Sequence, residues 1–109
     1  MKVDLPLRLG RGMNGREHHF TRARRVRAER HAVGIVLACE RHNRPQLPCT
    51  VTLTRIAPSE GLDGDNLQGS LKAVRDAVAG WFGIDDKSPL IEWEYAQRKG
   101  PWAVEIEAL

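Results

Sequence analysis

The chain has 109 residues, a formal net charge of +3 and only two cysteines, Cys39 and Cys49. Two cysteines without C-x-x-C spacing exclude a disulfide framework, and no apolar run approaches the roughly 18–20 residues of a membrane span. We therefore expect a single soluble domain over residues 1–109, located in the cytoplasm, without a signal peptide and without contact to a membrane.

The charge is divided unevenly along the chain. Residues 1–44 carry a formal charge of +7, and residues 45–109 carry −4. A basic half suits phosphate groups, because affinity for nucleic-acid phosphates comes mainly from Lys and Arg, and an acidic half suits a metal ion. A solvated, arginine-rich helix is the simpler alternative, and it is the commoner explanation for charge runs in general.

The first half of the chain predicts a strand, a loop and a long helix. Residues 2–9 alternate apolar and polar side chains, the period of a half-buried strand, and Pro6 favours an edge position. The glycine-rich residues 10–15 predict a loop. From about His19 to His42 the composition predicts a helix with separate apolar and basic sides, which must end before Pro45.

The second half predicts a strand, a helix and a hairpin. Residues 49–56 are rich in β-branched side chains and alternate strictly, which is typical of a strand. Residues 67–82 predict a second helix, with Leu67, Leu71, Val74 and Val78 on one face. Residues 90–97 and 102–107 alternate on either side of turn residues and predict a β-hairpin. The expected fold is α+β, in the order β-α-β-α-β-β, with a small mixed sheet and two helices.

Two acidic pairs flank the second predicted helix. Asp63 and Asp65 precede it, and Asp85 and Asp86 follow it. Carboxylates within roughly 4–6 Å of one another repel unless a cation lies between them. Mg²⁺ is typically held by one or two carboxylates together with substrate phosphate. If the two loops converge, they predict a catalytic metal site, although an Asp before a helix is more often only an N-cap.

The motifs in this region resemble those of the RusA family of Holliday-junction resolvases, small endonucleases carried by phages or prophages. The resemblance rests on the runs DGDNLQ at 63–68, KAVRDAV at 72–78 and IDD at 84–86. They match the family's D-x-D-N-L run, its K-A-x-x-D-A-L helix and its D-D pair. The likeness covers nearly the whole chain in order, but only residues 62–86 are specific.

The resemblance implies a metal-dependent endodeoxyribonuclease that resolves Holliday junctions or related branched DNA in recombination and repair. It implies that Asp63, Asp65 and Asp86 are the essential metal-binding carboxylates, with Asp85 beside them and Lys72 as the catalytic lysine. The cofactor would be Mg²⁺, with Mn²⁺ as a substitute, and the metal would activate a water for phosphodiester hydrolysis. A homodimer is also implied, because a four-way junction presents paired strands to cut.

The spacing before Lys72 departs from the family pattern. Five residues separate Asn66 from Lys72, three more than the family has. In a regular helix Lys72 would lie about 20° around the axis from Asp65, but the insertion adds about 4.5 Å of rise. A bulge at Gly69-Ser70 would absorb the insertion, and both alternatives stay open. A plain ion pair of Lys72 with Asp76 is the non-catalytic interpretation.

The basic segment supplies the candidate DNA contacts, which are Arg16, Arg22, Arg24 and Arg27. The alternative function is a non-catalytic phage DNA-binding protein with a RusA-like fold. A Ca²⁺-binding module is a poorer hypothesis, because Leu67 and Val74 occupy positions where an EF-hand loop needs oxygen ligands.

Overall fold

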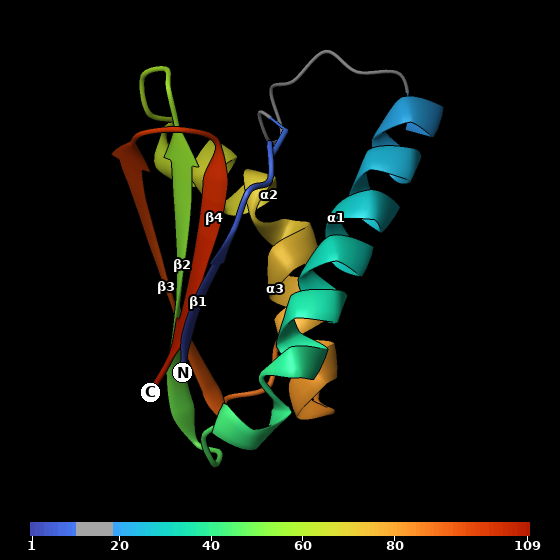
Figure 1. Ribbon diagram of the computed structural model, residues 1–109, viewed down its shortest axis with the longest axis vertical. Coiled ribbons are helices and arrows are strands. Elements are labelled where there is room, and N and C mark those ends of the chain that lie inside the picture. Colours follow the sequence, from blue (N-terminus) through green and yellow to red (C-terminus); the bar gives the residue numbers. More distant parts are fainter. Residues whose placement is uncertain (11–18) are drawn as a thin grey trace.

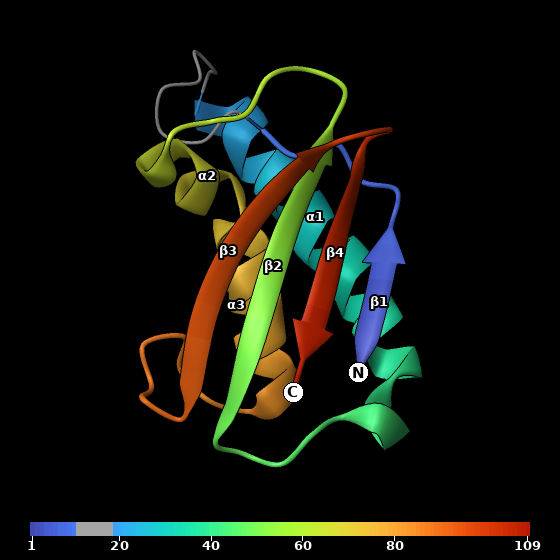
Figure 2. The ribbon, with the colours of Figure 1, turned by 90° about the vertical axis from the view of Figure 1, so that its left-hand side faces the viewer.

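The structure is a computed structural model, and it describes residues 1–10 and 19–109. Four strands form one mixed sheet in the order β1-β4-β2-β3, and the helices cover one of its faces (Figures 1 and 2). The elements are β1 (Lys2–Leu5), α1 (His19–Cys39), the 3₁₀ helix η2 (Arg41–Asn43), β2 (Cys49–Ala57), α2 (Gly64–Ser70), α3 (Lys72–Phe82), β3 (Ile91–Lys99) and β4 (Ala103–Ala108). The α+β class expected from the sequence is confirmed.

The core lies between the sheet and helices α1 and α3. Alternate residues of the two central strands supply its floor, since successive side chains of a strand point to opposite faces. The largest fully buried members are Val51 and Leu53 of β2, Val104 and Ile106 of β4, Val33 and Leu37 of α1, Leu71, and Val74 and Val78 of α3. The apolar face predicted for residues 67–82 therefore packs as expected, whereas α1 buries the C-terminal part of its predicted apolar side, Val33 and Leu37, and leaves Ala23 exposed. Among the helices of the described residues, none has the length and apolar character needed to cross a membrane.

The first strand is shorter than its alternation predicts. β1 ends at Leu5, directly before Pro6, which lacks the N–H that strand pairing requires. β1 pairs antiparallel with β4 alone and forms one edge of the sheet, as Pro6 indicated.

The predicted C-terminal hairpin is wrong. β3 pairs parallel with β2, and β4 pairs antiparallel with the opposite side of β2, so β2 lies between them. Residues 100–102 cross the end of β2 (Figure 2), where the Gly100 N–H donates to the Ala57 carbonyl at 3.0 Å. A Cβ on Gly100 would lie 2.9 Å from Ile56 Cγ2, so only glycine fits this crossing without displacing its neighbour. β2, which is buried along most of its length, takes a central place because both of its edges are paired there.

The second predicted helix is divided in two. Leu71 has φ −99° and ψ 4°, outside the helical region, and it joins the C-terminal end of α2 to the N-terminal end of α3. The Ser70 hydroxyl donates to the Leu67 carbonyl at 2.8 Å, a local bond that competes with the helical pattern. The described residues thus contain three α-helices where the sequence predicted two.

Candidate functional site

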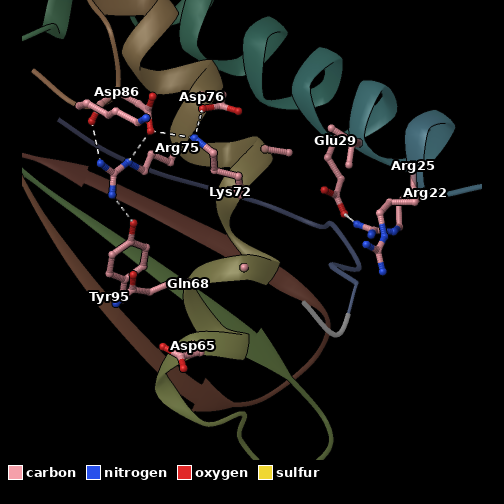
Figure 3. A pocket seen from close by; sticks show the side chains of 14 residues that line it. Arg22, Arg25, Glu29, Asp65, Gln68, Lys72, Arg75, Asp76, Asp86 and Tyr95 are labelled. Carbon is pink, nitrogen blue, oxygen red and sulfur yellow. Dashed lines mark hydrogen bonds and ion pairs between the residues drawn. The ribbon is translucent and has the colours of Figure 1, made fainter. Parts of the chain in front are cut away.

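A pocket of about 580 Å³ opens between α1 on one side and α2, α3 and β3 on the other (Figure 3). Its lining combines basic and acidic side chains with few apolar ones. They are Arg22, Arg25, Val26 and Glu29 of α1, Asp65, Gln68 and Gly69 of α2, Lys72, Ala73, Arg75 and Asp76 of α3, Asp86 and Lys87 of the following loop, and Tyr95 of β3. We call this space the helix pocket.

Asp86 forms the upper end of the helix pocket as drawn in Figure 3. Lys72 Nζ donates to Asp86 Oδ2 at 2.8 Å, and Arg75 Nε lies 3.1 Å from the same oxygen. The Lys72 hydrogen bond and the two nearby positive charges hold the pKa of the Asp86 carboxyl below its usual value. Asp86 is therefore a carboxylate that already has two cations as partners.

Lys72 connects the two acidic groups of this end. Its ammonium also donates to Asp76 Oδ1 at 2.8 Å, while Arg30 of α1 donates to Asp76 Oδ2 at 3.1 Å. Burial alone would lower the pKa of Lys72, but the hydrogen bonds to Asp76 and Asp86 outweigh it and raise the pKa. The ion pair with Asp76 that the sequence suggested is present, and the contact with Asp86 is added to it.

Arg75 fixes the wall between α3 and β3. Its guanidinium donates to the Asp86 carbonyl at 2.7 Å and to the Tyr95 hydroxyl at 2.8 Å, and it lies 4.8 Å from the centre of the Trp93 ring. Trp93 Nε1 donates to the same Asp86 carbonyl at 3.0 Å. Two donors on one carbonyl, one from α3 and one from β3, hold the loop that carries Asp86.

Asp65 lies at the opposite end of the helix pocket, in the first turn of α2 (Figure 3). Its side chain is exposed, and the described residues provide it with no hydrogen-bond or ion-pair partner. A carboxylate in a first helical turn is favoured by the helix dipole, but that effect needs no specific contact. Asp65 is thus the one predicted metal ligand in this pocket whose oxygens are available to a ligand.

Asp63 and Asp85 have local structural contacts. Asp63 is the N-cap of α2, where its Oδ1 accepts from the Asn66 N–H at 3.0 Å. Asp85 Oδ1 accepts from the Lys87 N–H at 2.8 Å in the loop after α3. Neither side chain lines the helix pocket. The cap that the sequence suggested for Asp65 is made by Asp63 instead.

The sequence predicted four metal-binding aspartates and one catalytic lysine. The fold places three of these five residues in the helix pocket, namely Asp65, Lys72 and Asp86. Lys72 and Asp65 share the pocket although the break at Leu71 removes the regular helix that the spacing argument assumed. In the parts of the chain that the structure describes, no group of three or more His, Cys, Asp or Glu side chains could hold a metal ion.

The predicted DNA contacts are divided. Arg22 lines the helix pocket from α1, whereas Arg24 and Arg27 are exposed on α1 outside its lining. Arg16 lies outside the described residues. Arg25, which the sequence did not single out, also lines the pocket and donates to the buried Glu29 at 2.9 Å.

Sequence reasoning missed Arg75 and Tyr95, which hold the site together. Arg75 follows Lys72 by three positions, a spacing that brings side chains to one helix face. Tyr95 follows Trp93 by two positions, so both lie on the helix-facing side of β3. Both spacings can be read from the sequence. They identify Arg75 and Tyr95 as neighbours only when it is known that α3 packs beside β3.

Asp65 and Asp86 have the donor type that Mg²⁺ prefers, since this ion is commonly held by one or two carboxylates with substrate phosphate and water, but they lie at opposite ends of the helix pocket. The fit is limited at Asp86, because Lys72 and Arg75 already contact one of its oxygens. Any metal held here therefore depends on oxygens that a substrate brings.

The chain was compared with protein-family models and with curated proteins, and it matches none of either.

Proposed function

We propose that the protein is a Mg²⁺-dependent endodeoxyribonuclease that cuts branched DNA such as a four-way junction, acting in the cytoplasm as a homodimer. The observation that carries the proposal is the helix pocket, in which Asp65 and Asp86 face one space with Lys72 between them in sequence. Carboxylates for a metal and a cation for a phosphate are what phosphodiester hydrolysis requires. The motif resemblance to RusA resolvases supports the same function.

The charges of the pocket suit a DNA strand. Arg22 and Arg25 come from α1, and Lys72, Arg75 and Lys87 come from the facing side. A phosphate backbone that enters between them has cations on both sides, and counterion release favours its binding.

Lys72 has the capacity to contact a phosphate without losing its present partners. An ammonium has three N–H donors, and Asp76 and Asp86 accept two of them. The side chain is 55 % exposed, so the third donor can reach a substrate oxygen. Lys72 would then stabilise the negative charge that builds up on the phosphoryl group.

Asp65 and Asp86 are the residues that would hold the metal. When bound, Mg²⁺ would polarise the phosphoryl oxygen and lower the pKa of the attacking water. Asp65 supplies an unpartnered carboxylate, while Arg75 and Lys72 keep Asp86 ionised. Asp63 and Asp85 orient their own loops, so we expect them to affect cleavage less than Asp65 and Asp86 do.

The test is cleavage of a synthetic four-way junction in the presence of Mg²⁺, with Mn²⁺ as a second metal. We expect Asp65→Asn and Asp86→Asn to abolish cleavage and Lys72→Met to reduce it by about 100-fold, the usual effect of removing one charge-stabilising donor. Asp4→Asn, an exposed carboxylate on the edge strand β1, is the matched control and should cut normally. Full activity in Asp65→Asn would contradict the proposal.

One observation favours a second candidate, a non-catalytic DNA-binding protein of the same fold. Lys72 and Arg75 neutralise Asp86, and the described residues contain no carboxylate cluster for a metal. Such a protein would bind the junction equally well with Mg²⁺ and with a chelator, and it would cut under neither condition. Binding and cleavage measured on the same samples separate the two functions.

A further inference from the structure

A second pocket, of about 250 Å³, lies at the end of the sheet and is lined by residues of β2, of the loop after β2 and of the end of β3. Its lining includes Arg55, Ser59, Gly61, Arg98 and Lys99. We call it the strand-end pocket. Its volume is below the 300–1,000 Å³ usual for sites that bind drug-sized ligands, so its occupant must be small.

Arg55 is the central residue of this pocket. Only 4 % of its surface is exposed, and its Nε–H has no hydrogen-bond acceptor. Within residues 1–10 and 19–109, no carboxylate forms an ion pair with it, and its guanidinium lies 5.4 Å from the centre of the Trp102 ring. Burial lowers the pKa of Arg55 from its usual value. A buried charge without an anion is costly, and proteins normally provide it with a partner.

The other lining groups add positive charge. Lys99 pairs in strand register with Ala57, two positions beyond Arg55, and the described residues provide no ion pair for it. Arg98 is bound to Glu105 at 3.1 Å and is half exposed. Glu60 also lines the pocket, but its carboxylate forms no ion pair with Arg55 or Lys99. Two cations in the pocket are thus left without a counter-charge from the described chain.

The walls of the pocket are fixed before any ligand arrives. Gln97, the β3 neighbour of Arg55, accepts from the Leu62 N–H at 2.9 Å and donates to the Leu62 carbonyl at 2.8 Å. Gly61 packs so closely that a Cβ there would lie 2.9 Å from the Gln97 amide group. A ligand therefore meets a formed site and does not need to order the loop.

We propose that the strand-end pocket binds a phosphate group, with the Arg55 guanidinium and the Lys99 ammonium as its principal donors. A guanidinium presents N–H groups in a rigid fork that matches phosphate oxygens, and two cations balance the charge of a phosphate. The Ser59 hydroxyl provides a further donor. This site does not depend on the proposed nuclease activity, because it contains neither Asp65 nor Asp86. The phosphate would come from the DNA backbone or from free phosphate in solution.

The test is a titration of the protein with inorganic phosphate, followed by the NMR signal of the Arg55 Nε–H, with sodium chloride at matched ionic strength as the comparison. We expect a saturable downfield shift with phosphate and none with chloride. Arg55→Met and Lys99→Met should each weaken phosphate binding by about tenfold, the effect of losing one charge-assisted hydrogen bond. For Arg55→Met, binding is followed by the rise in thermal midpoint that phosphate produces.

Arg8→Met is the matched control. Arg8 also lies over the Trp102 ring, at 5.1 Å, but it does not line the strand-end pocket, so its loss should change phosphate affinity less than about twofold. Lys99 is exposed, and Lys99→Met keeps the test valid should Arg55→Met fail to fold. An unsaturable response of the wild type, or equal affinity in wild type and Lys99→Met, would overturn the proposal.

Junction binding identifies the source of the phosphate. If the pocket receives a DNA backbone phosphate, Arg55→Met weakens junction binding and lowers the slope of its salt dependence by about one unit. If the ligand is free phosphate, the variant loses phosphate binding and keeps its junction affinity. Both results retain the phosphate site, and neither depends on whether the protein cuts DNA.

Discussion

Arg75 and Arg55 have the same side chain and similar neighbours, but they differ in what accepts their hydrogen bonds. Each guanidinium lies over a tryptophan ring, at 4.8 Å for Arg75 on Trp93 and 5.4 Å for Arg55 on Trp102. Arg75 has a carbonyl, a hydroxyl and a carboxylate as partners, whereas Arg55 has no such group among the described residues. The first arginine therefore links α3, β3 and the loop that carries Asp86, and the second is the one that we propose binds a phosphate group.

The largest effect should come from removing Arg75, whose terminal nitrogens make two hydrogen bonds and whose Nε lies beside Asp86. Arg75→Met leaves the Tyr95 hydroxyl without its donor and removes one of the two cations beside Asp86, so we expect a loss of about 2–3 kcal/mol in the free energy of unfolding. Urea denaturation at pH 7 measures it. Arg30→Met is the control, because its ion pair with Asp76 is half exposed and should contribute less than about 1 kcal/mol.

A smaller loss in the free energy of unfolding should follow from removing one hydrogen-bond acceptor of Arg75. Tyr95→Phe removes the hydroxyl that accepts from Arg75 and keeps the ring, so we expect about 1 kcal/mol. The effect should disappear in an Arg75→Met background, because the hydroxyl then has no donor to lose. A double-mutant cycle measures this coupling, and additive effects would show that the contact contributes nothing.

The contribution of Asp86 to the stability of the protein should depend on pH. The pKa of Asp86 is below its usual value in the folded protein, chiefly because Lys72 donates a hydrogen bond to it. Its contribution to stability is therefore complete above a pH of about 4, the pKa of an unfolded Asp, and is lost as the pH falls further. The difference in unfolding free energy between wild type and Asp86→Asn, below about 1 kcal/mol at pH 7 for a partly exposed pair, should shrink toward pH 3.

The smallest change in stability is expected at Arg55, and its sign distinguishes the two arginines. Without phosphate, Arg55→Met should alter the free energy of unfolding by less than about 1 kcal/mol or raise it, because an apolar side chain replaces a buried charge that has no anion. Denaturation in a phosphate-free buffer measures the difference. A loss as large as that of Arg75→Met would mean that Arg55 is a structural residue and not a ligand group.

Periodicity predicted where the strands and the helical segments lie, but neither how the strands pair nor where the second predicted helix breaks. The turn chemistry of residues 98–101 indicates a change of direction, and it is the same whether the next strand pairs beside β3 or on the far side of β2. The break at Leu71 was hidden because Leu71 continues the apolar face of the second predicted helix, and only Gly69 and Ser70 marked a weak point. Pairing and helix breaks depend on tertiary packing, which a local pattern does not contain.

The residues of the candidate site also fall into those that the sequence predicted and those that it did not. Motifs identified Asp65, Lys72 and Asp86 as a group, and the fold brings them to one pocket. Arg75 lies within the run KAVRDAV, but at a position that the family pattern leaves variable. Arg55 did leave a signal, since it occupies the position after Val51 and Leu53 on the core-facing side of β2, where a charged side chain is unusual. Whether such a residue finds a partner is decided by segments far away in the sequence.

The position of β2 between β3 and β4 has a consequence for how quickly the protein folds. No strand of the sheet pairs with the strand next to it in the sequence across a tight turn, since Cys49 pairs with Ile91, Val51 pairs with Ala108, and Lys2 pairs with Glu107. Every ladder must therefore close a long loop before its hydrogen bonds form. Such nonlocal topology favours refolding in milliseconds to seconds, with helices α1 and α3 able to form before any part of the sheet.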